Sequence, residues 1–129
     1  IDLDSNNLTA LTNLSFLLES NKEFDKARKI EKKLHDKRIT NPYYHALLAD
    51  EAFFRGENEK AIKHYKRAIR MDNKVHEFYF GIAKVYYALN EIKRAESAMN
   101  KALAYNRTSA IESQYLAKLN FLKDLELRD

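Results

Sequence analysis

Side chains capable of chemistry occur in this chain, but their spacing forms no catalytic or metal-binding motif. The four histidines are His35, His45, His64 and His76. None of them pairs with another at i,i+4, the spacing that places two metal ligands on one face of a helix. Cysteine is absent, so the sequence holds no thiolate nucleophile or ligand. We therefore expect no metal, no cofactor and no catalytic residue, and we interpret the histidines as ordinary helical side chains.

Two acids and two glycines are the remaining candidates for chemistry. Glu57 and Glu59 flank an expected turn, where carboxylates are typical charges at a helix N-terminus. Nothing nearby would desolvate them into an acid–base pair. Gly56 and Gly81 are the only glycines, which is too few for a phosphate-binding loop. We expect Gly81 to allow close helix packing or the close approach of a ligand.

The charge of the chain is basic, with a formal value of +4 and a pI near 9.2. Residues 22–38 contain eight Lys or Arg side chains against four acids. A second basic set is Lys60, Lys63, Lys66, Arg67 and Arg70. Pairs such as Asp25 and Lys29 favour a solvated helix face. The alternative is non-specific binding to the phosphates of nucleic acid, which ranks behind the interpretations below because no RNA-binding motif accompanies the basic residues.

A repeat of 34 residues indicates the elements that must position these side chains. Its clearest members are Ala27, Ala61 and Ala95, and then Leu34, Ala68 and Ala102. Small residues recurring at this period predict stacked helix–turn–helix units. The composition, with 45% hydrophobic residues and one proline, suits an all-helical chain. No apolar run approaches the ~20 residues that a membrane span requires.

The period divides the chain into helix pairs over residues 8–41, 42–75 and 76–109, followed by a single helix over 110–127. Each pair breaks near its middle, at Asn21-Lys22, Gly56 and Asn90, because Gly and Asn tolerate the left-handed backbone that ends a helix. Small side chains from the two helices of a pair should let the helix axes approach closely. The expected partners are Ser15 with Ala27, Ala49 with Ala61, and Ala83 with Ala95.

The two ends of the chain differ in character. Residues 1–7 resemble the tail of a preceding repeat, and there is no initiator methionine, so we expect this chain to be part of a longer protein. At the other end, Ser109 and Glu112 predict a capping box. A helix should follow to about Leu127 and cover the apolar end of the last repeat, as open solenoids require.

These repeats resemble the tetratricopeptide repeat family. The residues that carry the resemblance in the third repeat are Tyr79, Ile82, Ala83, Tyr86, Ala95, Met99 and Ala102. The family's proline near the end of each repeat is absent, and Glu31 stands where the second helix of the first repeat would carry an aromatic residue. The resemblance implies an all-α fold, namely a right-handed superhelical solenoid of three helix pairs plus a C-terminal capping helix.

The resemblance also implies a concave groove, lined by the first helix of each pair, that binds a peptide or helix of another protein. Rings with a few charges suit such a groove, because aromatic side chains offer large contact areas. Phe53 and Phe80 could equally be core side chains. The expected groove residues are Phe16, Tyr43, Asp50, Phe54, Glu77, Phe80, Lys84, Tyr87 and Lys118, with Thr12, Glu19, Ala46, Phe53, Gln114 and Phe121 at related positions.

One kind of partner is not expected. Family members that bind the C-terminal tails of heat-shock chaperones hold the terminal carboxylate with Lys, Asn and Arg in the groove. The matching positions here hold Thr12, Phe16, Leu47, Glu77 and Gly81. None of these side chains could clamp a carboxylate, and Glu77 would repel it.

The alternative to an independent scaffold is an accessory or regulatory module within a larger protein. The segments Asn41–His45 and His76–Gly81 are similar to the C-terminal repeats of bacterial proteins that carry a transglutaminase-like region upstream. This similarity implies that the repeats pack beside a catalytic domain of the same parent chain. Any such chemistry would lie outside this sequence.

Overall fold

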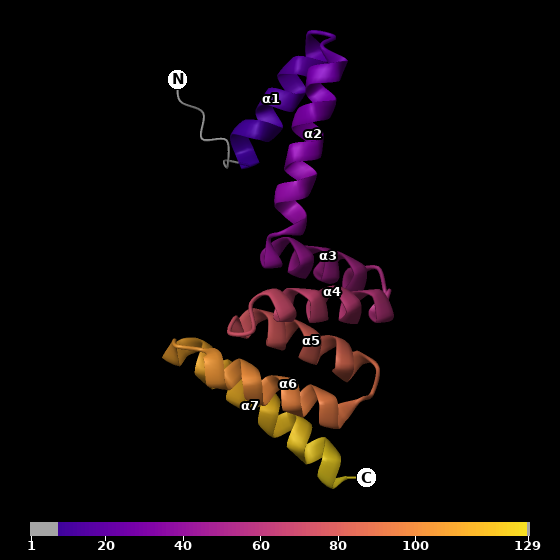
Figure 1. Ribbon diagram of the computed structural model, residues 1–129. Helices are drawn as coiled ribbons and strands as arrows, with labels where there is room; N and C mark the ends of the chain where they lie inside the picture. Colours follow the sequence, from indigo (N-terminus) through magenta and orange to yellow (C-terminus); the bar gives the residue numbers. More distant parts are fainter. Residues whose placement is uncertain (1–7, 129) are drawn as a thin grey trace. The chain divides into compact units, whose positions relative to one another are not determined.

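The computed structural model describes residues 8–128, all of whose regular structure is α-helical (Figure 1). The chain divides into two compact units, Ile1–Asn41 and Pro42–Asp129, called here the N-terminal and the C-terminal unit. The expected repeat tail at residues 1–7 lies outside the described residues. The all-α fold class predicted from the sequence is confirmed. No helix in the described part of the chain is long and apolar enough to cross a membrane.

The described part of the N-terminal unit is one helix pair, α1 (Leu8–Ser20) and α2 (Phe24–Ile39). Lys22 takes a φ of 61° between them, so the left-handed residue of this turn is the lysine of the predicted Asn21-Lys22 break. Ala27 and Leu34 are buried at the positions that the repeat predicted. In place of the family's aromatic residue, Glu31 is exposed and accepts a hydrogen bond of 3.3 Å from the Ser15 hydroxyl.

The C-terminal unit contains five helices, each packed against the next along the chain. They are α3 (Pro42–Phe54), α4 (Asn58–Met71), α5 (His76–Ala88), α6 (Ile92–Tyr105) and α7 (Ser109–Leu127). Left-handed residues separate the members of both pairs, Gly56 with φ 79° and Asn90 with φ 59°, as the sequence predicted. The α7 helix packs on α6 and buries Tyr115, Leu119 and Leu122, which closes the apolar core at this end.

Small residues lie at the centre of each pair in this unit. Ala49 and Ala61 are both 0% exposed, while Ala83 is 3% and Ala95 is 0% exposed. All four belong to one core cluster, which agrees with the predicted register. Larger side chains fill the space on either side, since Tyr65, Phe78 and Met99 are almost completely buried.

The capping box predicted at Ser109 and Glu112 is wrong. Ser109 is already the first residue of α7, and its N-cap is Thr108, which makes no side-chain capping hydrogen bond. The physical reason is a turn centred on Asn106. Its side-chain oxygen accepts both the backbone N–H of Thr108, at 3.2 Å, and the Thr108 hydroxyl, at 3.0 Å. The hydroxyl is therefore directed away from the first turn of the helix.

Candidate functional site

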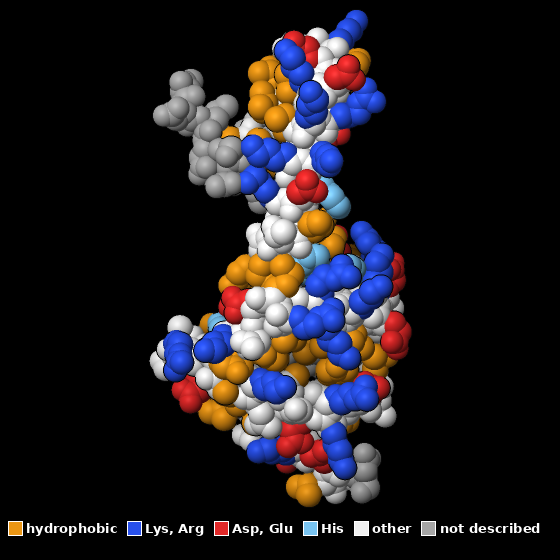
Figure 2. All heavy atoms as spheres, viewed as in Figure 1, with side chains coloured by type: hydrophobic (Ala, Val, Ile, Leu, Met, Phe, Trp, Pro, Cys, Tyr) orange, Lys and Arg blue, Asp and Glu red, His pale blue; other side chains and the backbone are white. Residues whose placement is uncertain are grey.

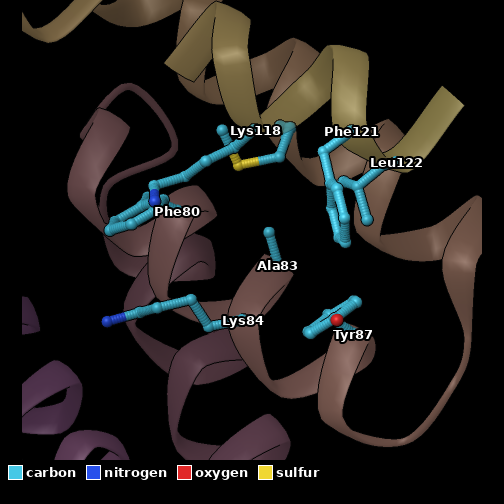
Figure 3. A pocket seen from close by; sticks show the side chains of 8 residues that line it. Phe80, Ala83, Lys84, Tyr87, Lys118, Phe121 and Leu122 are labelled. Carbon is cyan, nitrogen blue, oxygen red and sulfur yellow. The ribbon is translucent and has the colours of Figure 1, made fainter. Parts of the chain in front are cut away.

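A hollow of about 220 Å³ opens between α5 and α7 in the C-terminal unit (Figure 3). Both helices pack against α6, and the space left between them is only partly filled by side chains. The residues that line the hollow are Phe80, Ala83, Lys84, Tyr87, Met99, Lys118, Phe121 and Leu122. The period of 34 residues explains this gathering, because it places equivalent positions of α5 and α7 side by side.

The floor of the hollow is apolar and its rim carries two half-exposed rings. Ala83, Met99 and Leu122 are all buried. Tyr87 is 47% and Phe121 is 49% exposed, and their rings meet edge to face with centroids 5.8 Å apart. Exposed rings above an apolar floor leave hydrophobic area in water that a bound side chain would cover.

Two lysines stand over one ring at the other side of the hollow. Lys84 Nζ lies 4.8 Å and Lys118 Nζ lies 5.7 Å from the centroid of Phe80, within the range of cation–π attraction. Figure 3 shows both ammonium groups on the side of Phe80, with Tyr87 and Phe121 opposite. Neither lysine forms an ion pair with any carboxylate of residues 8–128. The hollow therefore has a cationic side and an aromatic side.

Phe80 is held in place by a chain of polar and ring contacts. Its ring stacks on Tyr115, with centroids 5.0 Å apart and an interplanar angle of 29°. The Tyr115 hydroxyl lies 2.8 Å from His76 Nδ1, and His76 Nε2 lies 2.9 Å from Glu77 Oε1. Since a carboxylate only accepts, Nε2 carries the proton, and in the neutral ring Nδ1 accepts from the tyrosine. Burial, and then the charge of Glu77, raises the pKa of Tyr115.

Asp50 is another charged residue predicted for the groove, and it lies on α3. It accepts a hydrogen bond from the Tyr65 hydroxyl, and burial followed by this bond raises the pKa of Tyr65. The Tyr65 ring occupies the space beside Gly81, where an added Cβ would lie 2.5 Å from the ring. The structure thus favours close packing, and not the approach of a ligand, as the role of Gly81.

The sequence-predicted groove residues fall into three groups. Phe80, Lys84, Tyr87 and Lys118 line the hollow together, as does Phe121. On α3, Tyr43, Asp50 and Phe54 do not line it; Tyr43 meets Phe78 edge to face at 5.1 Å, and Phe54 is 93% exposed. Glu77 borders His76, and Phe16 is an exposed residue of the N-terminal unit. The residues that sequence reasoning missed are the floor residues Met99 and Leu122 and the ring support from Tyr115 and His76.

A second hollow, of about 460 Å³, lies among α4, α5 and α6. Its lining includes Lys66, Arg94 and Lys101, with the rings of Tyr79 and Tyr86. Arg94 lies 3.4 Å from Glu91 Oε2 and 5.9 Å from the Tyr86 ring, and Lys101 lies 5.8 Å from the Tyr79 ring. Because a carboxylate already neutralises the arginine, this hollow is a weaker candidate for an anionic ligand.

The basic residues elsewhere are mostly interspersed with acids. On the face seen in Figure 2, Lys and Arg side chains are spread over both units, with Asp and Glu side chains beside some of them. Ion pairs at i,i+3 join Lys26 to Glu23, Lys60 to Glu57 and Arg94 to Glu91. This arrangement is typical of solvated helix faces. No group of three His, Cys, Asp or Glu side chains in the described residues could hold a metal ion.

The helix pairs, the small residues inside them and the capping helix define an α-helical repeat protein of the solenoid class. The family described as "TPR repeat" matches residues 49–90, and the one described as "Tetratricopeptide repeat" matches residues 76–109. Tetratricopeptide repeat protein 8 of Caenorhabditis elegans is 28% identical over an alignment of 105 residues, and the match covers 76% of this chain and 21% of that protein. Residues 49–109 of the chain therefore resemble tetratricopeptide repeats, and the chain spans about a fifth of the length of this curated relative.

Solved structures of similar fold come from several proteins. PcrH in complex with the chaperone-binding region of PopD has a TM-score of 0.70 and 23% identity, covering 97% of each chain. The translocator chaperone SycD of Yersinia enterocolitica has a TM-score of 0.70 and 21% identity, covering 97% of this chain and 89% of SycD. The first TPR of Spaghetti (RPAP3), bound to the HSP90 peptide SRMEEVD, has a TM-score of 0.67 and 16% identity, covering 98% of each chain. At these identities the likeness establishes the fold.

Proposed function

We propose that this chain is a protein-interaction module that holds a peptide or helix of another protein in the hollow between α5 and α7. The observation that carries the proposal is the half-exposed pair Tyr87 and Phe121 above a buried apolar floor. Rings of this kind are typical anchors of binding surfaces, because they offer large area with few rotatable bonds. Similar folds in complexes with a PopD region, a YopD peptide and an HSP90 peptide support the kind of partner.

The partner in this proposal is not the C-terminal tail of a heat-shock chaperone. Two positions that would clamp the terminal carboxylate hold Glu77 and Gly81 in the C-terminal unit. The Glu77 side chain is 61% exposed and would repel an approaching carboxylate. Gly81 is buried against Tyr65 and presents no donor side chain. The related fold that binds an HSP90 peptide therefore supports peptide binding in general, not this ligand.

Peptide display on the immobilised chain tests the proposal. Peptides selected from a random library should lose about tenfold in affinity for Tyr87→Ala and for Phe121→Ala, the usual scale for a ring anchor in a binding site. The matched control is Phe24→Ala, which removes a ring that is 57% exposed on α2. Circular dichroism verifies that the helices remain. If no selected peptide responds to either rim substitution while the helices stay intact, the hollow is not the binding site.

A second candidate function is that of an accessory module whose hollow is covered by another part of its own parent chain, such as a transglutaminase-like domain. The observation that favours it is the small share, 21%, of the curated relative that this chain spans. Under this alternative, selected peptides bind the isolated chain but fail to bind the intact parent, because an internal segment already occupies the hollow. Equal affinity for both forms would exclude it.

A further inference from the structure

We propose that the segment held in the hollow carries an acidic side chain beside an apolar one. This inference rests on the proposed function and specifies its ligand. The carboxylate of an Asp or Glu side chain binds between Lys84 and Lys118, and the neighbouring apolar side chain rests between Tyr87 and Phe121. The recognised element is therefore a short acidic-apolar motif within a protein segment.

The two lysines are equivalent by register. Lys84 and Lys118 are separated by one repeat length of 34 residues, so they occupy the same place on α5 and on α7. The equivalent residue of α3 is Asp50, whose carboxylate is engaged by Tyr65. A line of charge thus runs across the three helices, negative at α3 and positive at α5 and α7. The acidic side chain of a bound segment is therefore attracted to the lysines of α5 and α7 and not to α3.

The free hollow leaves its two cations without a neutralising partner. Both ammonium groups lie within 6 Å of the centroid of the single Phe80 ring, and like charges drawn to one ring repel each other. Glu77, an acid on the same helix as Lys84, is engaged by His76 at 2.9 Å. A carboxylate can bridge two ammonium groups through its two oxygens while the ring contacts persist. Binding an acid therefore removes the repulsion and adds two charge-assisted hydrogen bonds.

The aromatic side of the hollow selects the neighbour of that acid. Tyr87 and Phe121 lie opposite the lysines, with Ala83 between the two sides. Because the side chain of Ala83 is small, the hollow is deep at this point. Its volume of about 220 Å³ accommodates one Leu, Met or Phe side chain. An acid without an apolar neighbour would leave these rings in water, and an apolar residue without an acid would leave the lysines unpaired.

The experiment compares matched variants on peptides chosen by display. Lys84→Gln/Lys118→Gln removes two charges from the hollow. The control Lys66→Gln/Lys101→Gln removes the same two charges from the second hollow. Selected peptides are synthesised in three forms: the unmodified peptide, a peptide with its acid changed to Gln or Asn, and a peptide with an amidated C-terminus. Affinities are measured by fluorescence anisotropy at low and at high salt.

The expected result is a loss of about tenfold for the Lys84/Lys118 double variant, consistent with two partly exposed ion pairs. The peptide whose acid is changed to Gln or Asn loses the same factor in affinity for the unsubstituted chain. It loses no further affinity for the Lys84/Lys118 double variant, since both changes delete the same interaction. C-terminal amidation and the Lys66/Lys101 control have no comparable effect. The salt dependence of binding flattens in the Lys84/Lys118 variant.

Three outcomes overturn the inference. Selected peptides without acids that still depend on Tyr87 would retain the proposed function and refute the acidic motif. Dependence on a free C-terminus would assign the lysines to a terminal carboxylate. An equal loss in the Lys66/Lys101 control would indicate general charge attraction. By contrast, peptides that respond to neither rim ring would refute the proposed function itself.

Discussion

Gly81 lies in the interior of α5, where alanine would ordinarily stabilise a helix, yet we predict that Gly81→Ala destabilises this protein. The added methyl group would lie 2.5 Å from two ring carbons of Tyr65 and 2.7 Å from its oxygen. The ring cannot simply move aside, because Tyr65 is 1% exposed and its hydroxyl is hydrogen-bonded to Asp50. Either α4 and α5 separate slightly, or the hydrogen bond is lost.

The opposing contributions can be weighed. Replacing glycine by alanine within a helix gains about 1 kcal/mol. Overpacking a tight core costs about 1–3 kcal/mol, and losing the hydrogen bond to Asp50 costs about 1 kcal/mol more. The net destabilisation is about 1–3 kcal/mol. For a chain of this length, that lowers the midpoint of thermal unfolding by roughly 4–11 °C.

Thermal unfolding followed by circular dichroism measures this shift in Gly81→Ala, Tyr65→Leu and the double variant. In the Tyr65→Leu background the ring is gone, so Gly81→Ala should become neutral or stabilising. Gly56→Ala is the matched control, since no atom lies within 4 Å of its added Cβ and its cost comes only from a φ of 79°. A rise in the midpoint for Gly81→Ala in the parent background would refute the close contact.

Two further predictions concern stability. Ala95→Leu should cost about 1–3 kcal/mol by overpacking, because Ala95 is 0% exposed and lies in the core cluster with Ala83; an unchanged urea midpoint would count against the register. Burial, and then the charges of Arg67, His45, Lys60 and Lys63, lower the pKa of His64 below its ordinary value of 6.5. The folded state therefore binds fewer protons than the unfolded state, and the free energy of unfolding falls as the pH drops through about 6.5. His64→Gln should reduce this loss between about pH 7 and pH 5, as measured by urea unfolding at each pH, whereas an unaltered profile would exclude His64 as its source.

The helix pairs could be predicted from the sequence because small residues mark them at fixed intervals. Gly56 and Asn90 predict the turns, and Ala61 and Ala95 identify the helix faces that must be buried. The capping box failed for a local reason. Ser109 and Glu112 satisfy the sequence pattern, but Asn106 binds the Thr108 hydroxyl and moves the helix start by one residue. Which hydrogen bonds neighbouring polar side chains make is decided by geometry that spacing does not encode.

For part of the predicted groove set, register alone decides where the side chains lie. Lys84, Tyr87 and Lys118 lie together because α7 continues the period of the preceding repeats. The floor and the supporting contacts required the structure. Nothing in the spacing shows that Met99 of α6 reaches the gap between α5 and α7, since its position also suits an ordinary core residue.

The contacts of Phe80 are compatible with both interpretations of its sequence position, a core ring and a groove ring. Tyr115 stacks on Phe80 from α7, and His76 fixes Tyr115 from the first turn of α5. These contacts hold the ring still while both lysines remain beside it. The two readings of Phe80 offered by its sequence position, core or groove, are therefore not exclusive. A ring anchored on one side can present its charge-attracting surface on the other, and such preorganisation lowers the entropy cost of binding.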